Sequence, residues 1–308
     1  ISTGKGRITS SASNKIAVIY AQGEILYGDG DENYIGQNLI ISALRKAQDD
    51  NNIKAIVLRV NSPGGSALAS ELIWREMELA SEKLPIVVSM GNLAASGGYY
   101  IACNADRIFA EPTTITGSIG VYGLIPNLNK LADNIGVNAE QVSTNTGANY
   151  SVFEPMTDAF RTVSTEGVEQ IYTTFIERVA TGRDMLVKDV DSVAQGRVWS
   201  GVEALEKGLV DALRNLDDAV SYAAELADIT DYKVRNYPNY KFDFEDKFNS
   251  FPFIKSKEKM LIEEFGEEYY NTYQSLKQLS KVKGIQARLP FVLNIKLNGL
   301  GSVRSEDP

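Results

Sequence analysis

Short apolar runs and amphipathic stretches alternate along the chain up to about residue 228. Runs of mostly apolar residues predict buried strands, and they lie at 15–23, 53–60, 85–90, 107–112 and 116–123. Helical periodicity is present at 36–48 and at 66–84, where Ile73, Met77 and Ala80 recur on one face. Strands that alternate with helices are typical of a mainly parallel sheet with crossover connections. The pattern therefore predicts an α/β fold.

Changes in composition divide the chain into three parts. Residues 1–14 are rich in Gly, Ser and Thr and are predicted to be a linker, followed by a folded domain at 15–228. In the extension at 229–308, apolar residues share one helical stripe, which predicts an amphipathic helix at about 259–281 and a flexible tail after it. This helix either packs on its own domain or contacts a partner. Glu residues on its polar face make binding to a membrane surface the weaker alternative.

The charge balance and the absence of histidine exclude several classes of function. The chain has 31 Lys and Arg, 40 Asp and Glu, and a net charge of -9. We therefore expect no nucleic-acid partner, because phosphate binding needs a basic face. With 0 histidines, no Ser-His-Asp triad, Cys-His dyad or His-bound metal can form within the chain. The single cysteine, Cys103, is expected to be a buried apolar residue, and we expect no metal and no cofactor.

The chain resembles a piece of a longer protein. No apolar run approaches the ~20 residues that cross a bilayer, and the sequence begins at Ile1 without a signal-like segment.

Three small-residue motifs follow predicted strands. NSPGG at 61–65 contains Gly64 and Gly65, which let the backbone turn sharply and direct N–H groups at a developing oxyanion. An ordinary turn is the simpler interpretation of this motif, because all of its residues favour turns.

ASGGYY at 95–100 places Ser96 at a tight turn from a strand into a helix, with Gly97 next to it. The first N–H groups of a helix favour negative charge, so this turn can expose a nucleophilic hydroxyl beside them. Taken alone, Ser96 is better explained as a helix N-cap. TGSIGVYG at 116–123 holds Ser118 among glycines that permit close backbone approach by an extended peptide. Its alternative is a strand with a bulge.

The combination of the three motifs resembles the Clp protease/crotonase superfamily. Ser96 lies 32 residues after Gly64, and Ser118 lies 22 residues after Ser96. Within the superfamily, the sequence is similar to the serine–lysine peptidase family that includes signal peptide peptidase A. The similarity runs from about residue 15 to 227 and includes QGRVWSGVEALEKGLVD at 195–211. It implies an α/β spiral of ββα units with a helical C-terminal extension.

The resemblance also implies roles for individual residues. Ser96 is expected to be the nucleophile of a serine protease. The N–H groups of Gly64 or Gly65, together with that of Gly97, are expected to form the oxyanion hole. Ser118 is expected to hydrogen-bond and orient a catalytic lysine, as the third group of an activated nucleophile does.

The expected lysine is missing from this sequence. Short members of the family carry it in a Gly-x-x-Lys-like segment, but the corresponding segment here is TGANYSVF at 146–153, with Tyr150 at the lysine position. Lys130 and Lys188 are the nearest lysines in the sequence and stand in no matching motif. Long members consist of two similar halves, with the lysine in the first. The chain therefore fits a second half that receives its lysine from an N-terminal half and is nearly inactive alone.

The resemblance implies a membrane-associated endopeptidase that degrades cleaved signal peptides or other apolar peptides. We expect a homo-oligomer in the bacterial inner membrane, with the catalytic domain on the periplasmic side. Two alternatives stay open. One is a crotonase-type acyl-CoA enzyme on the same fold, and the other is a half-domain that serves as a non-catalytic scaffold or binding module.

Overall fold

A computed structural model describes residues 12–140, 142, 144, 150–238 and 285–288. Its elements follow one another along the chain in this order: β1 Lys15–Gln22, β2 Glu24–Leu26, β3 Tyr34–Gly36, α1 Gln37–Asp49, β4 Ile53–Ser62, β5 Gly64–Ser66, α2 Ala67–Ser81, β6 Ile86–Ala95, α3 Gly97–Tyr100, β7 Arg107–Ala110, β8 Ile115–Gly117, β9 Tyr122–Gly123, α4 Asn129–Asn134, α5 Asp158–Arg183, α6 Val187–Val193, β10 Val198–Ser200, α7 Gly201–Glu206, β11 Ala212–Leu213, α8 Leu216–Leu226, β12 Lys233–Tyr237 and β13 Ile285–Arg288.

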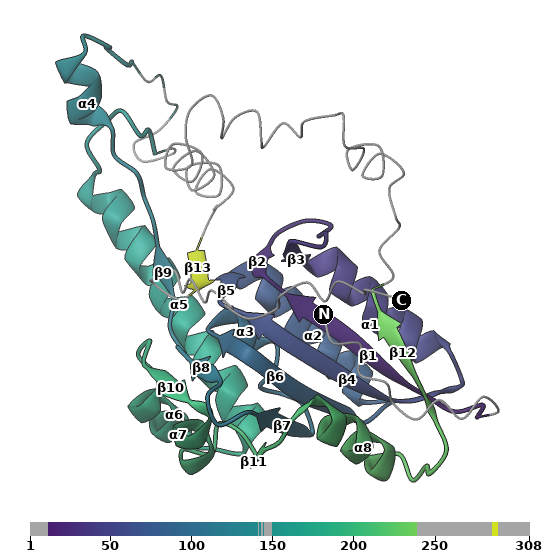
Figure 1. The fold of residues 1–308 in the computed structure, drawn as a ribbon. Helices are drawn as coiled ribbons and strands as arrows, with labels where there is room; N and C mark the ends of the chain where they lie inside the picture. The colour runs from purple at the N-terminus through teal and green to yellow at the C-terminus, as the bar shows by residue number, and fades with distance from the viewer. Residues whose placement is uncertain (1–11, 141, 143, 145–149, 239–284, 289–308) are drawn as a thin grey trace, which may run out of the picture.

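The larger sheet is built on three long parallel strands. Its strand order is β10-β8-β6-β4-β1-β12, and β7 pairs with β6 and β11 beside this path. All of these pairings are parallel except that of β8 with β10. The strands predicted at 53–60 and 85–90 are present as β4 and β6, so the α/β prediction is confirmed. Figure 1 shows these strands side by side at the centre of the fold.

A smaller sheet lies beside the ends of these strands, in the order β3-β2-β5-β13-β9. The chain passes from β1 to β2, β3 and α1, and then from β4 to β5 and α2, so a long strand, a shorter strand and a helix repeat. This repeat is the expected ββα unit. Because the strands of both units leave the larger sheet at the same edge, their turns converge on one region of the molecule (Figure 1).

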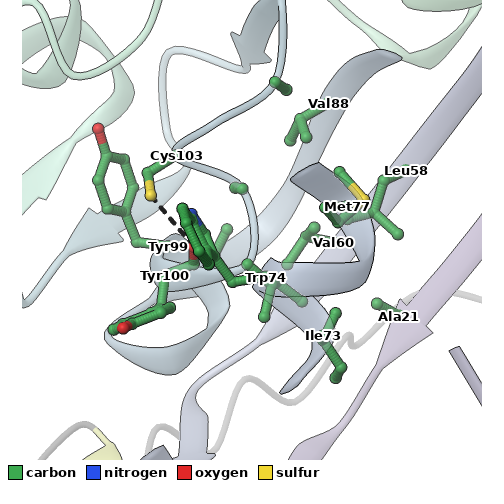
Figure 2. Close-up of a cluster of buried hydrophobic side chains, with 14 of the residues drawn as sticks. Ala21, Leu58, Val60, Ile73, Trp74, Met77, Val88, Tyr99, Tyr100 and Cys103 are labelled. Atoms are coloured by element: carbon green, nitrogen blue, oxygen red, sulfur yellow. Dashed lines mark hydrogen bonds between the residues drawn. The ribbon is translucent and has the colours of Figure 1, made fainter. Parts of the chain in front are cut away.

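Period-2 alternation along the strands fills two apolar cores. In β1, Ile16 and Val18 pack with α8 on one face of the sheet, whereas Ala17 and Ile19 belong to the core on the other face. Figure 2 shows part of this second core, where Ile73 and Met77 of α2 meet Leu58 and other strand residues. The apolar face predicted for this helix is therefore the buried one.

The structure differs from the sequence patterns in two places. The segment 116–123 is not one strand, because β8 belongs to the larger sheet and β9 to the smaller one. Beyond residue 228, β12 adds to the larger sheet beside β1, and β13 adds to the smaller one. Core strands therefore continue past the predicted domain boundary. The predicted helix at 259–281 lies outside the described residues, as do residues 1–11 of the predicted linker.

Candidate active site

Ser96 directly follows β6 in a conformation that L-residues rarely adopt. Its φ is 55° and its ψ is -117°, and the residue is fully buried. Such a backbone costs about 1–3 kcal/mol and persists only where the surroundings impose it. Here the Ser96 N–H donates to the Gly117 carbonyl at 2.8 Å, and the Ser96 carbonyl accepts from the Tyr100 N–H at 2.8 Å. The turn is therefore held from both sides.

The Ser96 side chain does not cap the helix that follows it. Ser96 stands at the N-cap position of α3, but its side chain accepts no bond from the helix. Its hydroxyl instead donates to the Gly120 carbonyl at 3.3 Å. The capping interpretation of this serine is therefore wrong, and the hydroxyl faces the segment that carries Ser118.

The backbones of Gly64 and Gly97 are in close contact. A Cβ added to Gly64 would lie 2.6 Å from the Gly97 nitrogen, and one added to Gly97 would lie 3.2 Å from the Gly64 Cα. Gly64 and Gly65 also have φ values of 92° and 157°, in the region that favours glycine. The NSPGG and ASGGYY turns therefore pack directly against each other next to Ser96. The Gly64 N–H already donates to the Ser62 hydroxyl at 3.1 Å.

Ser118 is held beside Ser96 by the pairing of two parallel strands. Ala95 of β6 is in register with Gly117 of β8, so each serine follows the last paired residue of its strand. Ser118 has a φ of 47°, is 2% exposed, and donates its N–H to the Arg197 carbonyl at 2.7 Å.

A cavity of about 300 Å³ adjoins Ser118. It is lined by Ser118, Gly120, Val121, Tyr122, Tyr172, Gln195, Gly196 and Arg288. A larger cavity of about 490 Å³ between α1 and β12 is lined by none of the predicted site residues. Of these two cavities, the smaller one is therefore the one that a predicted site residue, Ser118, helps to line.

A strand from the C-terminal region runs through this site. β13 pairs antiparallel with β5 on one side and with β9 on the other (Figure 1). The carbonyl oxygen of Ala287 lies 2.2 Å from a Cβ placed on Gly64 and 2.9 Å from one placed on Gly97. This oxygen therefore sits against the two glycine turns, and an extended backbone fits between β5 and β9.

No lysine among the described residues is buried near the serines. Lys130 and Lys188 are exposed. Tyr150, at the expected lysine position, donates its hydroxyl to the Pro126 carbonyl at 2.7 Å and stacks on Phe160 with ring centroids 4.8 Å apart. Neither partner belongs to the site, so the structure brings Tyr150 to neither serine.

Cys103 is a core residue, as predicted. It is fully buried, and its thiol donates to the Tyr100 carbonyl at 3.2 Å (Figure 2). Burial raises the pKa of the Cys103 thiol to about 12. A neutral thiol in this position contributes packing and no nucleophile.

Sequence reasoning missed β13 and its ion pair with β2. Arg288 donates to Glu24 at 2.8 Å across 264 residues of chain. The stretch around β13 contains too few residues to show strand periodicity, and nothing in the sequence near Glu24 distinguishes this carboxylate from others.

Comparison with known proteins defines first the class of fold and then the family. The sequence profile of Clp protease matches residues 9–116. Together with the parallel sheet and the ββα units, this match gives the chain a Clp protease-like α/β fold. A mutant of ClpP1 from Listeria monocytogenes superposes with a TM-score of 0.44 at 15% identity, covering 66% of this chain and 94% of that one. The profile of peptidase family S49 matches residues 78–230, which include both serines.

Curated relatives agree with this family. Protease 4 from Haemophilus influenzae is 46% identical over 214 residues, which are 69% of this chain and 35% of that protein. The putative signal peptide peptidase SppA from Enterococcus faecium is 34% identical over 242 residues, covering 75% of this chain and 70% of that protein. The putative protease slr0021 from Synechocystis is 34% identical, covering 73% and 79%. The chain belongs to peptidase family S49. It spans about a third of the length of Protease 4 from Haemophilus influenzae.

Proposed function

We propose that this chain is the serine-bearing part of a serine–lysine endopeptidase, with Ser96 as the nucleophile. The observation that carries the proposal is β13, an extended segment whose Ala287 carbonyl lies against Gly64 and Gly97. A substrate peptide bound in the same way would present a carbonyl to both glycine turns, beside Ser96.

The proposed reaction assigns one task to each group. The Ser96 Oγ bonds to the substrate carbonyl carbon while a lysine takes the hydroxyl proton. The carbonyl oxygen gains negative charge, which backbone N–H groups stabilise. Since the Gly64 N–H donates to Ser62, we assign this task to the N–H groups of Gly65 and Gly97. The lysine then passes the proton to the leaving amine, and water releases the acyl group from Ser96.

The lysine is proposed to come from a preceding half of a longer chain. Three observations support this: no lysine of the described residues is buried, Tyr150 is engaged elsewhere, and the matched region is about a third of Protease 4. The cavity next to Ser118 is the proposed place for the lysine side chain. There the Ser118 hydroxyl can accept a hydrogen bond from the amine, and partial burial lowers the pKa of an amine toward the neutral range.

The substrates are proposed to be extended apolar peptides, such as cleaved signal peptides. β5 and β9 form the two sides of a groove that β13 fills. Ala287 is fully buried in this groove, which favours a small side chain before the cut. Within the described part of the chain, no helix is long and apolar enough to cross a membrane. Association with the bacterial inner membrane, the periplasmic orientation and assembly into a homo-oligomer rest on the family resemblance.

The decisive experiment compares serine variants in a longer protein that contains this chain and its N-terminal half. Ser96→Ala should lower the cleavage of an apolar reporter peptide by at least ~10³-fold, since loss of a nucleophile removes the covalent step. Ser221→Ala, at an exposed serine of α8, is the matched control and should keep the parent rate. Equal activity of the Ser96→Ala variant would contradict the assignment. If none of these proteins cleaves the peptide but they turn over an acyl-CoA thioester, the acyl-CoA alternative is favoured. If they show neither activity, the scaffold alternative is favoured.

A further inference from the structure

Glu24 and Arg288 form an ion pair at the edge of the groove. Arg288 Nη1 lies 2.8 Å from Glu24 Oε1, and the two side chains are 19% and 14% exposed. Glu24 belongs to β2, whereas Arg288 belongs to β13. A pair that is largely removed from water loses much more on neutralisation of one partner than a surface pair does. The structure thus places a carboxylate next to a cation at this position.

The position of Arg288 follows from the place of Ala287. The Ala287 carbonyl sits against Gly64 and Gly97, which under the proposed function is the position of the cleaved bond. Arg288 is the next residue toward the C-terminus, in register with Gly64. In a peptide bound the same way, this residue is the first one after the cleaved bond, and its side chain meets Glu24.

Tyr122 belongs to the same cluster. Tyr122 is in register with Gln286 of β13. Burial raises the pKa of the Tyr122 phenol, the Arg288 guanidinium acts in the lowering direction, and Glu24 acts in the raising direction. Both charges therefore act on the same phenol. Tyr122 and Arg288 also line the cavity next to Ser118.

We propose that Glu24 is a specificity-determining residue of the groove, which selects a basic side chain immediately after the cleaved bond. The proposal rests on the proposed function for the identity of the groove, and it adds a substrate class: peptides with a small residue before the cut and Arg or Lys after it. Residues 285–288 of the chain itself have this pattern, with Ala287 followed by Arg288, and they lie between β5 and β9.

The test is a charge swap read out by binding, so it needs no catalysis. A labelled peptide KGIQAXLP, the sequence of residues 283–290 with X at the Arg288 position, carries Arg, Gln or Glu at X. The chain's own strand is weakened in two ways: by Arg288→Glu, which keeps Glu24, and by Glu24→Arg, which keeps Arg288. Fluorescence anisotropy then measures the affinity of each peptide for each variant.

The Arg288→Glu chain should bind the Arg peptide about tenfold or more tighter than the Gln peptide, since charged hydrogen bonds are among the stronger ones. The Glu24→Arg chain should reverse the order and prefer the Glu peptide. A control chain with Glu32→Arg added to Arg288→Glu should keep the Arg preference, because Glu32 is exposed. Equal affinities for the Arg and Gln peptides, an order that does not reverse, or no binding of any peptide would overturn the proposal.

A second readout separates this proposal from the proposed function. In the two-half protein, Glu24→Gln should lower kcat/KM about tenfold for peptides with Arg after the cut and leave peptides with Gln there unchanged. If the two-half protein is inactive but the binding order reverses as expected, the peptidase proposal fails and the Glu24 subsite stands. If it is active without any preference at this position, only the Glu24 proposal fails. Circular dichroism confirms folding of the Glu24 variants, and the peptide series on the Arg288→Glu chain leaves Glu24 intact.

Discussion

Two buried serines with positive φ stand side by side at the ends of neighbouring parallel strands. Ser96 and Ser118 have φ values of 55° and 47°. Backbone of this kind is concentrated at functional sites, because a fold that did not need it would relax it. The hydrogen bonds to Gly117 and Arg197 hold both turns in place. At the residue scale, the unusual feature of the site is therefore its backbone conformation and not the type of its residues.

Cys103 provides a residue-scale prediction. With the pKa raised to about 12 by burial, only ~10⁻⁴ of the thiol is ionised at pH 8, against about a quarter of an ordinary cysteine. The native chain should therefore react with an aromatic disulfide reagent at least ~10³-fold more slowly than the chain in denaturant. Absorbance of the released thiolate measures both rates. Rapid labelling of the native chain at pH 8 would show that the thiol is accessible.

At the scale of elements, carboxylates join the ends of strands and helices. Asp211 accepts the Ile108 N–H of β7 at 2.7 Å, and Arg183 at the end of α5 donates to both of its oxygens. The Arg183 side chain is 8% exposed and that of Asp211 is 23% exposed. This one carboxylate therefore attaches the longest described helix to the larger sheet.

Asp211→Asn should lower the free energy of unfolding by about 2 kcal/mol, because the change leaves the Arg183 charge mostly buried without its partner. Urea denaturation followed by circular dichroism measures the change. The matched control is Glu78→Gln, which breaks the Arg75–Glu78 pair on the exposed side of α2, where the side chains are 57% and 39% exposed. That variant should lose less than about 0.5 kcal/mol. Similar losses in both variants would mean that burial of the Arg183 pair is unimportant.

At the scale of the whole molecule, the proposed machinery is divided between this chain and another part of a longer protein. The groove, both serines and the glycine turns are present here, but the base is proposed to come from outside. The 308-residue chain alone should therefore show little or no cleavage of an apolar peptide, with residual catalysis of only ~10³–10⁴ over water from the oxyanion donors.

Adding the N-terminal half within one polypeptide should restore turnover, as measured by release of a fluorescent product. The control is the same two-half protein with its first half's Gly-x-x-Lys lysine changed to methionine, which should be as inactive as the isolated chain. Cleavage by the isolated chain at the rate of the longer protein would contradict the division. In that case a lysine within this sequence would be the base.

The sequence by itself determined the layers of the fold and singled out the proposed nucleophile. Apolar runs predicted β4 and β6, the stripe through Ile73 and Met77 predicted the buried face of α2, and three spaced motifs singled out Ser96. These features depend on short stretches of sequence, because apolar periodicity indicates which face is buried and a run of small residues indicates a sharp turn.

Only the tertiary structure decided which distant segments meet in the groove. It divided 116–123 between two sheets, placed Ala287 against Gly64 and Gly97, and paired Arg288 with Glu24 across 264 residues. Strand pairing over such separations depends on backbone hydrogen bonds that almost any residues can form, so four residues of β13 carry no local signal of their partner. The proposed role of Ser96 could therefore be predicted from the sequence, whereas the placement of β13 between β5 and β9 and the charge of Glu24 beside it could not.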